Sequence, residues 1–394
     1  MALADYDLDE VKKRIYEAYQ KENPIIEEFR EYARALASHV KPIRPYSVNA
    51  VSFVSSDGGD NRLFFNPAVI ELVRVVDSRG NQCAVDAIAS NTLIKDLNER
   101  VKTGSPLLVE PLKRMCEDLN IQEVEQLSYL LSGLEGGKST GAIRCYRDIV
   151  EWAVLYDLII NYEWGNDTII VRDGLLRTKS FKRELFPKID AKIREGIEKH
   201  KRKNVNIFIV GVAKQSAVLS RLAVALELEG VFHKTYPCYA KVPNDIEEKC
   251  YNYDRTWLDT YESIHSENQI REKKGEHEKS YLYQSMGQMF LVKFGDRPFD
   301  PVWPVDITSW QVPDADRILG QLTVDAQQGF PIPDYPMCIQ KAHDYAKVNG
   351  IEVSILQDIL FEGITQNLND QEKERVLRMK YLGEDLASRR YKNA

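Results

Sequence analysis

The sequence predicts an α/β fold in which a mixed β-sheet is flanked by helices. Two runs, Thr168 to Arg172 and Val205 to Val212, have the β-branched composition of buried strands, and a charged helical segment from Lys188 to Lys203 separates them. A strand, a helix and a strand in that order form a βαβ unit, so these two strands are expected to be parallel neighbours. Earlier runs, Val48 to Ser56 and Ile70 to Asp77, are each followed by turn residues, which favours an antiparallel pair.

Helical periodicity surrounds these strands. Residues 6–40 carry two amphipathic segments separated by Pro24, and the chain is helical again between about 92 and 160. The segments expected to be helical there are Leu107–Leu119, Val124–Leu134 and Ala142–Ile160. Later helices are expected at Gln215–Glu229, around His343 and at Asp370–Arg390, and later strands at Met289–Phe294 and Pro304–Trp310.

These elements suggest three parts. Residues 1–45 are expected to form an N-terminal helical arm, and residues 351–394 a C-terminal helical extension. Between them, residues 46–350 form the main domain, with a helical insertion at about 92–150 and a charged insertion at about 243–285 that resembles a solvated loop. The terminal helices either pack on the protein's own core or provide a surface for a second copy or a partner.

Composition excludes several classes of protein. The chain has 394 residues and is 43% hydrophobic, enough for a substantial core. No run approaches the roughly 20 apolar residues that span a bilayer, and the first residues turn charged at once, so a cytoplasmic location without membrane contact is expected. The six cysteines are scattered without a C-x-x-C pair, which predicts buried reduced thiols rather than a zinc site.

The formal net charge is −7, which argues against a generic basic nucleic-acid coat. Phosphate groups are neutralised by clustered lysines and arginines, and an acidic chain offers few such clusters. Any contact with DNA is therefore expected to be local or shared with a partner.

Two apolar strands each end in Asp-Gly, at Asp57-Gly58 and at Asp173-Gly174. Taken singly, each pair has a simple reading as a turn marker. Together they are more informative, because carboxylates at the ends of buried strands repel one another in a low-dielectric setting unless a cation offsets them. The pair therefore suits a divalent metal ion.

Three further residues are candidates. Glu151 lies in an apolar helical stretch near the acids Asp148 and Asp157, although a single helical glutamate is usually a solvated surface residue. Lys214 follows a predicted parallel strand, where an ammonium group can steady a phosphate, or it is simply an exposed loop lysine. His343 can bind a metal or relay a proton, but a single helical histidine is more often structural.

The order of these motifs resembles the NurA nuclease family over roughly residues 46 to 350. The resemblance rests on Asp57-Gly58-Gly59, Glu151, Asp173-Gly174-Leu175, Gly211-Val212-Ala213-Lys214, and Pro333 through Ala342-His343. It implies an RNase H-like sheet and an Mn²⁺-dependent (or Mg²⁺-dependent) DNA nuclease that degrades 5′ to 3′, with endonuclease activity as a further option. It also implies a homodimer that works with the hexameric HerA ATPase, in DNA repair or in antiviral defence.

Carried over to this chain, the resemblance makes Asp57, Glu151, Asp173 and His343 metal ligands and places Lys214 and His343 around the scissile phosphate. This sequence departs from the family pattern at Ser56, at Leu175 and in the long charged insertion, without losing a candidate ligand. Two other hypotheses stay open: an RNase H-like scaffold that regulates or anchors a DNA motor without cutting, and a resolvase-like or transposase-like phosphotransferase.

A glycine-rich stretch from Gly133 to Thr140 looks like a phosphate-binding loop but departs from the Walker pattern. Ser132 stands where the pattern needs a glycine, and the preceding segment is helical rather than a buried strand. ATP hydrolysis is therefore expected to belong to the partner.

Overall fold

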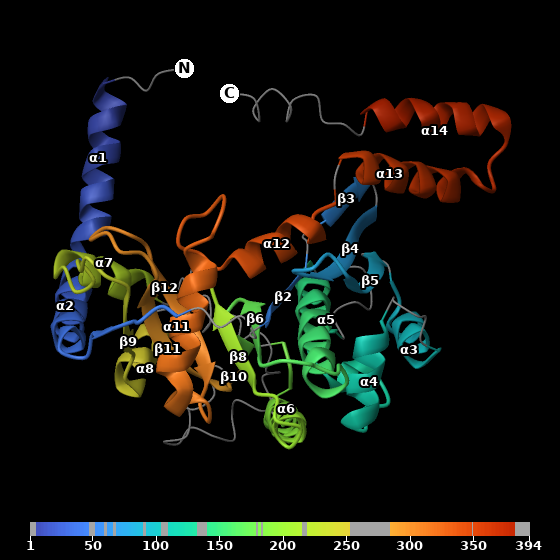
Figure 1. Cartoon of the computed structure of the whole chain (residues 1–394). Coiled ribbons are helices and arrows are strands. Elements are labelled where there is room, and N and C mark those ends of the chain that lie inside the picture. Colours follow the sequence, from blue (N-terminus) through green and yellow to red (C-terminus); the bar gives the residue numbers. More distant parts are fainter. Residues whose placement is uncertain are drawn as a thin grey trace, which may run out of the picture. The chain divides into compact units, whose positions relative to one another are not determined.

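The computed structural model describes residues 5–46, 52–58, 61–65, 68–89, 92–103, 109–131, 140–178, 180–182, 184–214, 219–252, 284–348 and 350–382. The chain forms two compact units (Figure 1). The first comprises Met1–Ser55, Ile159–Lys179 and Arg183–Gln340, and the second comprises Ser56–Leu158, Ser180–Lys182 and Lys341–Ala394.

The first unit is built on a mixed sheet. Its strands lie in the order β1 (Lys41–Pro42), β9 (Cys238–Lys241), β11 (Gly287–Lys293), β12 (Val302–Thr308), β8 (Ile207–Val212) and β6 (Thr168–Asp173). β6 and β8 are parallel, from Thr168 opposite Ile207 to Asp173 opposite Val212, and helix α6 (Phe186–Lys201) connects them. The predicted βαβ unit is therefore confirmed. The other neighbours in this order from β1 to β8 pair antiparallel, so the sheet is mixed as expected.

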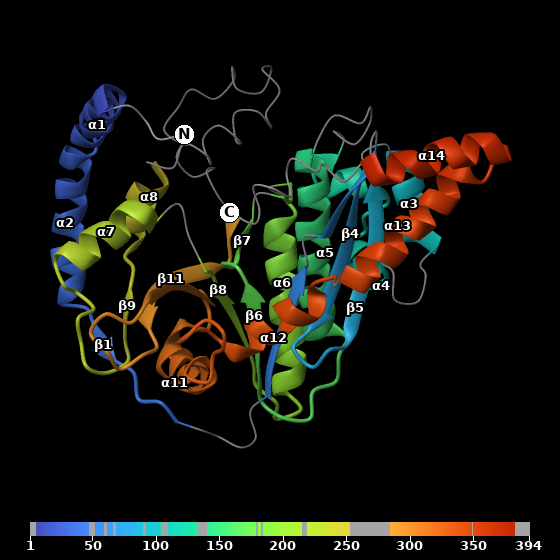
Figure 2. The same ribbon diagram turned by 90° about the horizontal axis from the view of Figure 1, so that it is seen from above.

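Each face of this sheet is covered by helices, because side chains of opposite parity enter different cores. Phe290 and Val292 of β11 lie in a cluster with α11 (Ala315–Ala326) and the start of α12 (Met337–Ala346). Met289 and Leu291 lie in a second cluster with α2 (Asn23–Ala37), α7 (Ser220–Leu228) and α8 (Asn244–Asn252). Figure 2 shows α7 and α11 on opposite sides of β11. Helix α2 thus packs on the protein's own core, whereas α1 (Asp5–Gln20) leaves Ile15 and Tyr19 exposed.

The second unit is organised around β4 (Ala68–Asp77). β5 (Gln82–Ala89) pairs antiparallel with β4, as do β3 (Asn61–Phe65) and the last residues of β2 (Ser52–Gly58). β2 begins in the first unit, next to β6, and its last three residues belong to the second. The described α-helices of this unit are α3 (Ile94–Thr103), α4 (Glu110–Asp118), most of α5 (Thr140–Ile160), the part of α12 from Lys341 onward, α13 (Gly350–Thr365) and α14 (Asp370–Leu382).

The structure corrects four local predictions. Of the predicted helix Val124–Leu134, the described residues, which run to Leu131, form no α-helix, and Val124–Gln126 is a 3₁₀ turn. Helix α8 lies at the start of the segment expected to be a solvated loop, and it buries Ile246 and Cys250. Strands β3 and β5 and helix α11 lie where no element was predicted. Cys83 is only partly buried, whereas the other five cysteines are buried, and all six are free thiols.

Two further points concern the expectations from composition. No helix within the described ranges is long and apolar enough to cross a membrane. Residues Gly133 to Ser139 of the glycine-rich stretch lie outside the described residues.

Candidate functional site

The carboxyl ends of the parallel strands carry the group with the most distinctive chemistry. Asp173 is the last residue of β6, and Lys214 follows the last residue of β8 by two positions. The Lys214 Nζ atom lies 3.0 Å from Asp173 Oδ2. The two residues that the sequence placed on neighbouring strand ends are therefore in direct contact.

A third side chain, Tyr335, completes this group. Its hydroxyl lies 3.2 Å from Asp173 Oδ1 and 3.3 Å from the Val212 carbonyl oxygen, so it donates its one proton to either acceptor. The Lys214 ammonium lies 5.8 Å from the centre of the Tyr335 ring, within the range of a cation–π contact. Each oxygen of the Asp173 carboxylate thus has a hydrogen-bond donor within 3.2 Å.

Tyr335 is held from behind by its neighbours. The Trp303 ring packs edge-on against it, with 4.8 Å between ring centroids, and Tyr335 is fully buried. The buried Gln340 side chain accepts a hydrogen bond from the Ile332 amide and donates one to the Tyr335 carbonyl oxygen at 2.9 Å. The hydroxyl that faces Asp173 is therefore fixed by packing and by hydrogen bonds.

Exposure at this group is graded. The side chain of Tyr335 is buried, that of Asp173 is 17% exposed, and that of Lys214 is 32% exposed. The carboxylate therefore stands at the boundary between the core and solvent, where a ligand from solution can reach it. Lysine beside it supplies a positive charge that can be exchanged for another cation or directed at an anion.

Glu151 lies in the second unit, on α5, and is also ion-paired. Arg147, one turn earlier, places its Nε atom 3.5 Å from Glu151 Oε1 and its Nη1 atom 3.3 Å from Glu71 Oε1. Glu71 belongs to β4, and its side chain is 2% exposed, whereas that of Glu151 is 16% exposed. Glu151 is therefore a largely buried carboxylate that shares Arg147 with a second acid, and it is not a solvated surface residue.

The other two candidates are placed by their elements. Asp57 is in β2, opposite Val76 of β4, one residue before the strand ends, so the predicted strand-end position is confirmed, although its side chain lies outside the described residues. His343 is in α12 and is half-buried. The structure brings Asp173 and Lys214 together in the first unit, while Asp57, Glu151 and His343 belong to the second. A single centre made of all five residues is therefore a proposal.

The residue types fit a divalent cation. Aspartate and glutamate supply the hard oxygen donors that Mn²⁺ and Mg²⁺ prefer. The Lys214 ammonium already places a positive charge beside Asp173, as a bound metal ion would. Among the side chains that the structure describes, no three histidine, cysteine, aspartate or glutamate residues gather closely enough to hold a metal ion. The Asp57 side chain lies outside the described residues, so the described side chains do not include every metal ligand expected from the sequence.

Tyr335 was not among the residues predicted for the site. A signal was present, because Tyr335 stands between Asp334 and Pro336, directly before the helix that carries His343. Prolines restrict the backbone on both sides of such a turn, which favours a fixed side chain.

Fold and contacts together define a mixed α/β protein that presents an ion-paired aspartate at the carboxyl end of a parallel strand. Comparison with solved structures finds NurA nucleases. The NurA nuclease from Sulfolobus solfataricus is 14% identical, with a TM-score of 0.39, over 93% of this chain and 99% of that one. A structure of NurA bound to dAMP and manganese is 12% identical, with a TM-score of 0.41, over 95% of this chain and 99% of that one.

These are the structures that the resemblance in the sequence led us to expect. No family model matches the chain. No curated protein matches it either. With TM-scores near 0.4, the function has to be argued from the residues of this chain.

Proposed function

We propose that this protein is a metal-dependent DNA nuclease that hydrolyses phosphodiester bonds. The observation that carries the proposal is the Asp173 carboxylate, which stands at a strand end with Lys214 at 3.0 Å and Tyr335 at 3.2 Å. Open α/β sheets bind their ligands at this edge. An anionic substrate such as DNA needs a cation at a carboxylate site, and the hard oxygen donors here suit a divalent ion.

In this proposal Asp57, Glu151, Asp173 and His343 would hold the ion, which is Mn²⁺ or Mg²⁺. When bound, such an ion polarises a phosphate oxygen and lowers the pKa of a bound water molecule. Tyr335 holds the Asp173 carboxylate in one orientation. Lys214, which is partly exposed, neutralises Asp173 and is within reach of a phosphate that approaches from solvent.

The test is the cleavage of end-labelled linear DNA in Mn²⁺, Mg²⁺ or EDTA. We expect cleavage with the metal ions and none with EDTA, and we expect Asp173→Asn and Asp57→Asn to abolish it without unfolding the protein. Asp167→Asn is the matched control, because Asp167 lies just before β6, at the opposite end from Asp173, and bonds Asn206 and Arg317 instead. Undiminished cleavage by Asp173→Asn, with the wild-type metal dependence, refutes the assignment.

The same substrate distinguishes the finer proposals. Release of nucleotides from the 5′ end indicates the 5′-to-3′ exonuclease, internal cuts indicate an endonuclease, and cuts confined to a sequence or junction indicate a resolvase-like enzyme. A chain that cuts nothing but changes the ATPase rate of its partner is the scaffold of the alternative hypothesis.

The partner is proposed to be a HerA-type hexameric ATPase, in DNA end processing or in antiviral defence. The net charge of −7 supports a shared grip on DNA, because this chain alone offers few cations to neutralise phosphates. Addition of a HerA-type ATPase is expected to stimulate cleavage and make it dependent on ATP. Cleavage that is identical with and without the ATPase counts against the partnership.

A homodimer is proposed on the basis of the exposed apolar stripe on α13. Ile351, Ile355 and Ile359 follow one another at helical spacing and are 75%, 53% and 59% exposed. Exposed aliphatic side chains in a row are unfavourable in water and mark an association surface. We expect the mass of a dimer in light scattering at micromolar concentration, and a monomer for Ile355→Glu/Ile359→Glu. A monomeric wild-type protein refutes this part.

A further inference from the structure

Asp173 is followed by an abrupt reversal of the chain. Gly174 has a φ of +115°, a conformation that L side chains rarely adopt, and its amide donates to the Val212 carbonyl oxygen at 2.8 Å. The chain then returns across β8 at Gly211. A Cβ atom on Gly211 would lie 2.6 Å from the Gly174 oxygen and 2.7 Å from the Leu176 nitrogen, so only glycine leaves room for this crossing.

The returning segment is held at Leu176 by both of its backbone groups. The Leu176 amide donates to Asp306 Oδ2 at 3.0 Å, and its carbonyl oxygen accepts from the Met286 amide at 3.1 Å. On the other side of the turn, Arg172 Nη1 donates to the Leu175 carbonyl oxygen at 2.8 Å. The turn that follows Asp173 is thus tied down residue by residue.

Asp306 is the centre of this arrangement. It lies in β12 opposite Gly211 of β8 and Met289 of β11, and its side chain is fully buried. A Cβ atom on Gly287 would come within 2.7 Å of Asp306 Cβ. Gly287 of β11 therefore makes room for the buried carboxylate, and Gly211 of β8 makes room for the backbone at Leu176 that this carboxylate holds.

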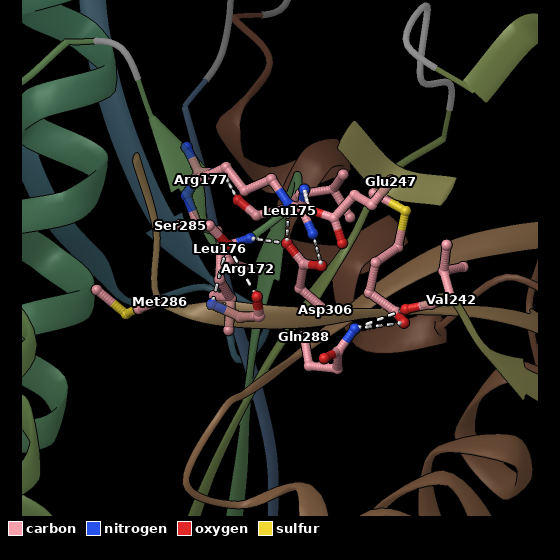
Figure 3. A network of polar contacts seen from close by, with 12 residues as sticks. Arg172, Leu175, Leu176, Arg177, Val242, Glu247, Ser285, Met286, Gln288 and Asp306 are labelled. Atoms are coloured by element: carbon pink, nitrogen blue, oxygen red, sulfur yellow. Dashed lines mark hydrogen bonds and ion pairs between the residues drawn. The ribbon is translucent and has the colours of Figure 1, made fainter. Parts of the chain in front are cut away.

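Arg177 fixes the Asp306 carboxylate in turn. Its Nε atom donates to Oδ2 at 2.7 Å and its Nη2 atom to Oδ1 at 2.8 Å, while Nη1 bonds Glu247 of α8. Figure 3 shows the three charged side chains converging beside Leu175 and Leu176. All three are at most 5% exposed, so water does not weaken these bonds.

The helix that carries Glu247 is itself anchored to the sheet. The Val242 carbonyl oxygen, just before α8, accepts from Gln288 Nε2 at 2.8 Å, and the Val242 amide donates to the Met289 carbonyl oxygen at 2.9 Å. The chain of contacts therefore runs from the sheet through Glu247 and Arg177 to Asp306, and from there to the backbone three residues after Asp173.

We propose that Asp306, oriented by Arg177 and Glu247, is a positioning residue for the Asp173 carboxylate: it fixes the reversal at Leu176 so that Asp173 keeps one orientation at the strand end. This inference rests on the proposed nuclease function for its consequence, since an oriented carboxylate matters only if it binds an ion or a substrate. Residues that orient ligands in this way typically change metal affinity or activity by about 10-fold to 100-fold when replaced.

The alternative is that the buried ion pairs only stabilise the core. Asp306→Asn alone does not separate the two, because it turns an acceptor of three hydrogen bonds into a group that places an N–H donor against other donors. The variant Arg177→Met/Asp306→Leu/Glu247→Leu removes every charge at once. Replacing a whole buried ionic group by apolar residues of similar size is often neutral for stability, yet here it leaves the Leu176 amide without its acceptor.

The experiment measures three quantities for the full chain: hydrogen exchange of the peptide that contains Leu176, Mn²⁺ affinity by titration calorimetry, and DNA cleavage. For both variants we expect faster exchange at Leu176 and about tenfold weaker Mn²⁺ binding with a matching loss of cleavage. Asp167→Asn, an acid-to-amide change at the other end of β6, is expected to leave all three unchanged.

The outcomes are distinct. If the triple variant is folded and keeps wild-type exchange and Mn²⁺ affinity, the positioning role is overturned. If Asp306→Asn does not fold, the triple variant alone tests the positioning role. If the wild-type protein neither binds Mn²⁺ nor cuts DNA, the proposed function fails by itself. Exchange at Leu176 then still decides whether Asp306 holds the turn.

Discussion

Replacing Tyr335 by phenylalanine tests whether the Asp173 carboxylate is used in an oriented form. The change removes the hydroxyl that lies 3.2 Å from Asp173 Oδ1 and keeps the ring that packs on Trp303. Lys214 stays at 3.0 Å from the other carboxylate oxygen, so the charge of Asp173 remains compensated. What is lost is one of the two contacts that fix the direction of the carboxylate.

The magnitude follows from the contacts. A hydrogen bond to a charged group contributes about 1.5–3 kcal/mol and a neutral one about 0.5–1.5 kcal/mol. The distances of 3.2 Å and 3.3 Å are long for a hydroxyl donor, and one proton serves both acceptors. We therefore expect Tyr335→Phe to lower the free energy of unfolding by about 1 kcal/mol. Cleavage is expected to fall by about tenfold or more, because a group that orients a metal ligand is lost.

The assay combines urea unfolding with DNA cleavage over a titration of Mn²⁺. Tyr239→Phe is the matched control, since the Tyr239 hydroxyl also donates to an aspartate, Asp316, in the same core and away from Asp173. We expect the control to lose stability without losing activity. Wild-type cleavage and an unchanged Mn²⁺ requirement in Tyr335→Phe refute the idea that Tyr335 orients Asp173.

Three further predictions concern Gly211, Asp167 and the metal ion. Gly211→Ala is expected to lower the free energy of unfolding by about 1–3 kcal/mol, because the new methyl group meets backbone atoms at 2.6 Å and 2.7 Å, whereas Gly165→Ala, with nothing within 4 Å, leaves urea unfolding unchanged. Burial raises the pKa of Asp167, but hydrogen bonds from Asn206 and Arg317 outweigh it and hold the pKa below its ordinary 3.8. Its stabilisation is therefore complete above that pH and lost as the pH falls through the lowered value, so unfolding curves of wild type and Asp167→Asn should converge on acidification. EDTA is expected to abolish cleavage, and added Mn²⁺ to restore it; cleavage that survives EDTA rules out the metal-dependent mechanism.

The parts of the fold that could be predicted are those in which one local pattern decides the structure. β6 and β8 are short runs buried on both sides, and every residue of β8 is buried, which is the pattern of a central parallel strand. The intervening helix has a charged face, so its boundaries were predicted to within two residues at each end. The strand-end position of Asp173 followed from the β6 run, and that of Asp57 followed from the earlier run Val48 to Ser56.

The elements that were missed depend on contacts distant in sequence. α8 is rich in charge, and only its packing in the first unit's core shows that Ile246 and Cys250 are buried. A buried acid such as Asp306 looks like a surface residue in the sequence, because its partner Arg177 is more than a hundred positions away. Pairing of this kind is set by the sheet register, which a single sequence does not contain.

The site also contains residues that the sequence predicted and one that it missed. Lys214 and Asp173 were predicted because each lies at the carboxyl end of its own strand, and parallel neighbours bring their carboxyl ends together. Tyr335 lies in a loop after the last strand, 162 residues from Asp173. It is not part of a strand pattern, so the strand patterns did not indicate its role. Sequence patterns therefore identify the residues on the sheet, whereas the residues that orient them come from the connections.

The Asp-Gly pair at the end of β6 shows that a turn signal and a functional position need not be alternatives. Gly174 is required because its φ of +115° reverses the chain within one residue, and a Cβ atom there would meet the Arg172 guanidinium at 2.6 Å. Such a sharp reversal fixes the residue before it, since the next residues are tied to β8 and β12. A rigid carboxylate at the edge of the core is what a cation or phosphate site needs. The tight turn therefore does not argue against a role for Asp173; it is the means by which such a role can be met.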